Sequence, residues 1–126
     1  MDYVMVHELT HKMDILQYHS WENEAFNKAI ELSRKKVYDN FEEIQKLFWD
    51  GGKYEMDAAL SDIMSALTNN KMKLAYGHKE WGKIANEEQM EIFANISSMD
   101  ILNKKYDEPI RSALSILFEA YKGVVD

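Results

Sequence analysis

The chain has 126 residues, a length that suits one compact domain. It carries 15 Lys and Arg against 22 Asp and Glu, a net charge of −7, which argues against nucleic-acid and membrane partners because both need clustered cations. Hydrophobic residues make up 46%, too many for a disordered chain, and the lack of cysteine excludes disulfides, Cys-ligated zinc and thiol catalysis. We therefore expect a single acidic, soluble domain over residues 1–126.

The first half of the chain shows helical periodicity. Residues 3–19 form the first predicted helix, because apolar residues recur there at three- and four-residue spacing. Ser20 is a candidate N-cap for a second helix, which extends to Phe48 with a possible break within the polar run 33–40. The pair Gly51-Gly52 then ends helical structure, since consecutive glycines make a continued helix costly.

The second half adds three shorter helices. Residues 57–67 form the third, and residues 86–101 form the fourth, in which Asn86 and Gln89 resemble a capping box. Pro109 is expected in the first turn of a fifth helix, where its missing N–H does no harm. Between the third and fourth helices the period fails, and residues 71–76 alternate as a short extended segment would. The predicted fold is mainly α, with about five helices and at most that one extended segment.

Residues 7–11 read HELTH, a match to the metal-binding motif H-E-x-x-H on a predicted helix. Because they are four residues apart, His7 and His11 lie one turn apart on the same face and can reach one metal ion. Glu8 is rotated by about 100° from His7, which places its carboxylate beside the metal, where it can take a proton from a metal-bound water. Two ordinary helix histidines are the alternative interpretation of this spacing.

Such a histidine pair needs a third protein ligand, with a fourth position left for water. Glu91 is the preferred candidate, because Ala94, Asn95 and Ser98 on its helix face are small enough for two helices to approach closely. His78, in the irregular loop, is not excluded, and the acidic residues 87–88 are fallbacks that a solvated first turn also explains.

Two strings, HELTHKMD at residues 7–14 and EIFAN at residues 91–95, carry a family resemblance. They are similar to the gluzincin type of zincin metallopeptidases, and more narrowly to the anthrax lethal factor-like group, in which H-E-x-x-H-x-x-D precedes a Glu-x-Phe-Ala helix. The resemblance implies a zincin-like helical core that hydrolyses peptide or protein substrates. It also implies His7, His11 and Glu91 as ligands of Zn²⁺, with Glu8 as general base and acid.

A second resemblance covers more of the chain. Residues 61–67, 76–78 and 91–95 look like the zincin-like part of phage and prophage minor head (head-morphogenesis) proteins. This likeness implies phage structural proteins as partners, and a place in the cytoplasm of a bacterial host cell or in the virion. It keeps open a non-enzymatic assembly module that retains a zincin-like core.

The loop between the third and fourth helices supplies candidates for a hydrogen bond to the developing oxyanion. Zincins resemble one another in placing a Tyr or His there, which suggests Tyr76 and His78, although Lys73 or Trp81 fit the loop equally well. On the first helix, Asp14 falls on the histidine face and either accepts a hydrogen bond from an imidazole or is an ordinary solvated carboxylate.

One feature departs from the zincin pattern. In those families a sheet precedes the active-site helix and aligns the substrate, whereas His7 lies six residues from the start of this chain. We therefore expect the chain to be a fragment of a longer protein, and only residues 71–76 could offer an edge strand.

Overall fold

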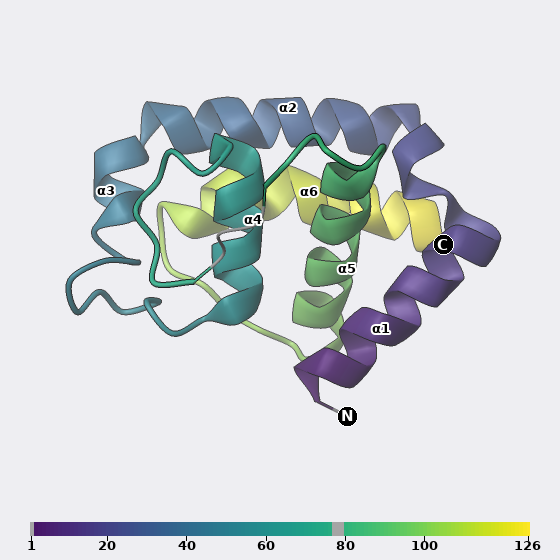
Figure 1. Ribbon diagram of the computed structural model, residues 1–126, viewed down its shortest axis with the longest axis horizontal. Helices are drawn as coiled ribbons and strands as arrows, with labels where there is room; N and C mark the ends of the chain where they lie inside the picture. The colour runs from purple at the N-terminus through teal and green to yellow at the C-terminus, as the bar shows by residue number, and fades with distance from the viewer. Residues whose placement is uncertain (1, 77–79) are drawn as a thin grey trace.

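Six α-helices make up most of the computed structural model, which describes residues 2–76 and 80–126 (Figure 1). They are α1 (Tyr3–Met13), α2 (Glu24–Asp39), α3 (Phe41–Gln45), α4 (Ala58–Thr68), α5 (Glu87–Ile101) and α6 (Ile110–Val125). A π-helical turn (Asp14–Tyr18) and a 3₁₀ turn (Ser20–Glu22) connect α1 to α2. The described residues contain no strand, so the prediction of a mainly α fold is confirmed and residues 71–76 form no strand.

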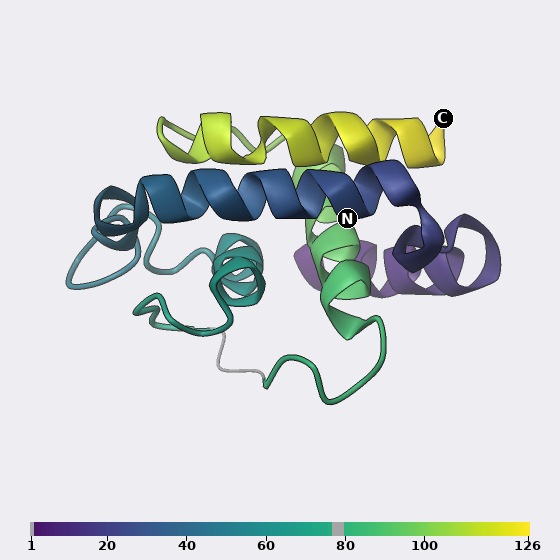
Figure 2. The same cartoon turned by 90° about the horizontal axis from the view of Figure 1, so that it is seen from above.

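The two longest helices, α2 and α6, run side by side, and α4 and α5 cross below them (Figures 1 and 2). The first helix packs against α5 rather than against the long pair. Aromatic rings fill the junction: Phe26 of α2 and Phe93 of α5 are fully buried and meet edge to face, with ring centroids 5.4 Å apart. Burying such rings supplies a large share of the hydrophobic stabilisation. The core therefore holds α5 rigidly between α1 and the long helices.

The first helix changes from α to π geometry at Asp14 and continues to Tyr18, close to its predicted end at residue 19. The Asp14 carboxylate is fully buried and accepts hydrogen bonds from the backbone N–H and the hydroxyl of Ser20, each at 2.6 Å. His19 between them adopts left-handed backbone geometry, with φ 52°. The chain therefore turns sharply at residues 19–20. The prediction of Asp14 as a partner of an imidazole or a solvated group is wrong, and the N-cap of α2 is Asn23, not Ser20.

The remaining boundaries agree with the sequence prediction only in part. The long second helix divides at Asn40 into α2 and α3, within the expected polar run. Asn86 adopts a left-handed conformation, with φ 64°, and its side chain makes no capping bond, so the predicted capping box is absent. Pro109 occupies the position just before α6 rather than its first turn. Helical structure ends at Gln45, so the prediction that Gly51-Gly52 stops the helix is wrong. Gly52 instead lies against the preceding turn, where a Cβ would be 2.3 Å from the Lys46 carbonyl oxygen.

None of the helices in the described part of the chain is long and apolar enough to cross a membrane.

Candidate metal centre

The interface between α1 and α5 is unusually polar for a helix contact. Thr10 of α1 donates to the Ser97 hydroxyl of α5 at 2.9 Å, and both residues are buried. Nearer the start of α1, the Tyr3 hydroxyl donates to the Asn95 side-chain oxygen at 2.5 Å. The α5 face here consists largely of small residues, which allows the helices to approach closely enough for side chains to bond directly. We call this α1–α5 contact the seam.

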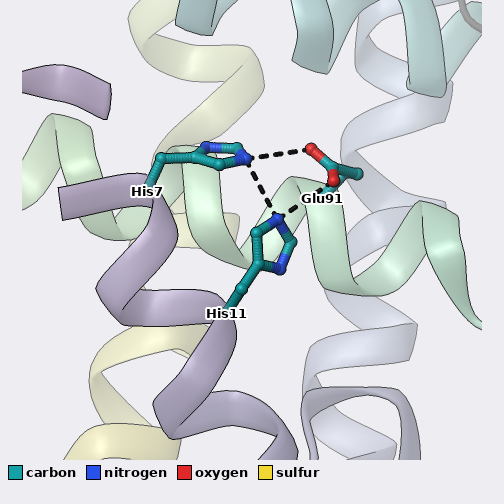
Figure 3. Close-up of side chains that lie close together, drawn as sticks. All are labelled: His7, His11 and Glu91. Carbon is teal, nitrogen blue, oxygen red and sulfur yellow. Dashed lines mark hydrogen bonds and ion pairs between the residues drawn. The ribbon is translucent and has the colours of Figure 1, made fainter. Parts of the chain in front are cut away.

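Three partly buried side chains converge within the seam (Figure 3). The Nε2 atoms of His7 and His11 lie 3.1 and 3.0 Å from the two carboxylate oxygens of Glu91, and 3.0 Å from each other. Both imidazoles come from one face of α1 because their spacing is one helical turn. The carboxylate arrives from α5 and points between the two rings. The three residues that the sequence singled out as ligands are thus brought together, and we call them the triad.

The donor set of the triad suits zinc. Two imidazole nitrogens and one carboxylate oxygen form a typical catalytic zinc set, with bonds of about 2.0–2.2 Å. Ligand atoms on a tetrahedron of that size are about 3.3–3.6 Å apart, and the imidazole nitrogens lie 3.0–3.1 Å from each other and from the nearer Glu91 oxygens, so small side-chain shifts would fit the ion. The side chains of His7, His11 and Glu91 are 13, 19 and 14% exposed, so the site is largely buried but each ligand is still reached by solvent. The residues present therefore fit a zinc ion.

Glu91 changes the acid–base behaviour of its neighbour. The hydrogen bond from His11 to Glu91, and the negative charges of Glu91, Glu8 and Asp14, raise the pKa of His11 above its ordinary value, although burial acts in the opposite direction. A positive ion in the triad is thus electrostatically favoured, whether it is a proton on the imidazole or a metal cation. Glu8 itself is exposed, and its charge acts on His11.

In the described part of the chain, the His7 imidazole is positioned by packing against an aromatic ring rather than by a hydrogen bond to its second nitrogen. Metal-binding histidines usually donate their second ring N–H to a carboxylate or carbonyl. The Nδ1 atom of His7 is buried with no hydrogen-bond partner among the described residues, and packing against the Tyr3 ring, 5.5 Å between centroids, orients the imidazole instead. The amide of Asn95 donates to the Glu91 carbonyl oxygen at 2.9 Å. Asn95 therefore joins Tyr3 of one helix to the main chain of Glu91 on the other.

Tyr3 and Asn95 are residues that sequence reasoning missed as parts of the site. The signal was available, because Tyr3 lies four residues before His7 and Asn95 four residues after Glu91, each one turn from a ligand. Burial, together with the carboxylates of Asp62, Glu91 and Asp57, raises the pKa of the Tyr3 hydroxyl. The hydroxyl thus stays protonated near neutral pH and keeps donating to Asn95.

The other predicted site residues lie elsewhere. The Tyr76 hydroxyl is directed at the Met56 sulfur, 3.5 Å away, and no contact with the triad is found for it in the described chain. His78 lies outside the described residues. Of the fallback ligands, Glu88 binds the Arg34 guanidinium instead. The indole N–H of Trp81 donates to the Ser65 hydroxyl at 2.9 Å, which ties its loop to α4.

Comparison with protein-family models, curated proteins and solved structures gave no match to this chain. The resemblance to zincins and to phage head proteins therefore stays a prediction that rests on the chain's own motifs.

Proposed function

We propose that the triad binds Zn²⁺ and that the chain is a zinc-dependent metallopeptidase-like domain. The observation that carries the proposal is the convergence of His7, His11 and Glu91, with nitrogen and oxygen atoms 3.0–3.1 Å apart, although 80 residues separate the last two in the sequence. The H-E-x-x-H pattern alone arises by chance in some helices, but chance does not direct a carboxylate from a second helix at both imidazoles.

Bound zinc would supply the Lewis acidity that activates water and polarises a scissile carbonyl. The rest of the chemistry belongs to the chain. Glu8 follows the first ligand on α1, is exposed, and lies near enough to act electrostatically on His11. Its carboxylate can therefore take a proton beside the triad and return it to a leaving amine. Tyr3 and Asn95 would not touch the substrate. They position the ligands, because Tyr3 packs against the His7 ring and Asn95 bonds both Tyr3 and the Glu91 main chain.

The decisive experiment separates metal binding from catalysis. Purified protein should contain one zinc per chain by elemental analysis and should cleave a fluorogenic peptide library. Glu8→Gln should keep the zinc and lose at least a hundredfold in rate, since general-base removal typically costs 10²–10⁴-fold. The matched control is Glu43→Gln, which removes an exposed carboxylate on α3 and should leave the rate unchanged. A protein that takes up no zinc, or whose Glu8→Gln variant cleaves at the parent rate, contradicts the proposal.

A second function is favoured by the position of the triad in the seam. Its three side chains join α1 to α5 and are less than one-fifth exposed, which also suits a zinc ion that clamps two helices. A structural ion of this kind would serve a non-enzymatic assembly module, such as the phage head protein implied by the second resemblance. Stoichiometric zinc, a raised melting temperature and no cleavage of any library peptide would select this function over the peptidase.

A further inference from the structure

A second hollow, separate from the triad, carries positive charge that contrasts with the acidic chain. It has a volume of about 420 Å³ and lies between the end of α5, the α5–α6 connection and one face of α6. Four cations line it, Lys104, Lys105, Arg111 and Lys122, against the carboxylates of Asp100 and Glu119. The hollow thus has a local excess of two positive charges in a chain whose net charge is −7.

The cations are not all neutralised by the protein itself. Lys122 reaches Asp100 only at 4.0 Å, and the Arg111 Nε atom binds Glu108 at 2.8 Å. Lys104 and Lys105 are exposed, and neither has an ion pair among the described residues. Adjacent unpaired lysines repel each other, so an anion placed between them is electrostatically favoured. The α5–α6 connection therefore presents a ready site for carboxylate groups.

The floor of the hollow is apolar. Leu114 and Met99 are buried there, and the partly buried Phe118 adds an aromatic surface beside them. A nucleic acid would need a longer track of cations than four. An apolar floor with a cationic rim instead resembles the centre and edge of a protein–protein interface.

Spacing along α6 indicates the shape of the ligand. Arg111 and Lys122 are three helical turns apart on one face, about 16 Å along the axis, with Ser115 and Phe118 between them. An extended peptide covers that distance in about five residues. Figure 2 shows α6 along one edge of the molecule, beside α2 only on one side.

We propose that this hollow binds an acidic segment of a partner protein, an extended peptide in which carboxylates about five residues apart flank one apolar side chain. The apolar side chain packs on the part-exposed ring of Phe118, and the carboxylates meet Lys104, Lys105 and the two cations of α6. The site needs no metal, so it serves the chain whether or not the triad is catalytic.

The test uses a fluorescein-labelled peptide with two aspartates five residues apart and one phenylalanine between them. Anisotropy titrations are made in EDTA, which makes the result independent of the triad. We expect saturable binding that weakens with added salt. The double variant Lys104→Glu/Lys105→Glu should weaken binding at least tenfold. Lys35→Glu/Lys36→Glu, which reverses an adjacent exposed lysine pair on α2, should change it less than twofold.

A second variant guards against misfolding. Ser115 is exposed in the middle of the hollow, so Ser115→Glu should preserve the melting temperature while placing a carboxylate where the peptide must lie, and binding should again fall at least tenfold. Several results overturn the proposal: no binding at millimolar peptide, equal binding by the double variant, equal binding of a peptide with serine in place of phenylalanine, or tighter binding of a 20-nucleotide single-stranded DNA.

Discussion

A zinc ion held by the triad should stabilise the whole fold, because it joins α1 to α5 only when the chain is folded. At a free zinc concentration one hundred times the dissociation constant, mass action adds about 2.7 kcal/mol to the free energy of unfolding. Unfolding entropy is about 2.1 cal/mol/K per residue, which gives about 0.26 kcal/mol/K for 126 residues. The expected rise in melting temperature is therefore about 10 °C.

The assay is thermal unfolding followed by circular dichroism, in buffered zinc and in EDTA. His11→Ala should lower the melting temperature in EDTA, because Glu91 loses a hydrogen-bond partner, and should abolish the zinc-dependent rise. The quantity to compare is therefore the zinc increment in each variant, not the absolute melting temperature.

His19→Asn is the matched control. His19 is the other histidine of the α1–α2 region, it binds Glu22 and not the triad, and asparagine tolerates its left-handed backbone. This variant should keep the full increment of about 10 °C. An equal zinc increment in His11→Ala and in the parent protein would refute the assignment of the triad as a metal site.

Three other measurements test the same structure. Because Glu91 raises the pKa of His11, a proton should compete with zinc up to a higher pH than for a free histidine, so the zinc increment should grow from pH 6 to pH 8. In EDTA the melting temperature should change with pH in the opposite direction. The bond between protonated His11 and Glu91 stabilises the fold fully below about pH 6.5, and this stabilisation is lost as the pH rises through the raised pKa of His11. A melting temperature that is flat or rising with pH in EDTA would contradict this. Asp14→Ala should lower the free energy of unfolding by about 2–4 kcal/mol, because it leaves buried donors of Ser20 unpaired, and urea denaturation should show a smaller loss for Ser20→Ala. Asn95→Ala should cost about 1–3 kcal/mol in the same assay, because it breaks the buried link across the seam, and should also weaken zinc binding; unchanged zinc affinity would show that this link does not position the triad.

Local periodicity was enough to predict much of the fold. Helical repeats and turn residues indicated a mainly α chain, and the structure confirms it, with α4 within one residue of its predicted bounds. A wrong prediction, such as that for Asp14, concerns a side chain that bonds to a residue outside its own helical turn. Nothing in the apolar repeat of α1 shows that the Asp14 carboxylate will be buried and will bind Ser20 across the turn at residues 19–20.

Part of the candidate site was also predictable from the sequence, and part of it was not. The sequence by itself determined that His7 and His11 share a face, because four residues make about one helical turn whatever the rest of the chain does. Only the tertiary structure decided that Glu91 reaches both imidazoles and that Asn95 links Tyr3 to the Glu91 main chain. It also decided that the Tyr76 hydroxyl contacts Met56 instead of the triad. These contacts depend on the angle and depth at which α1 packs on α5, and that packing is set by the buried core as a whole rather than by the spacing of residues along either helix.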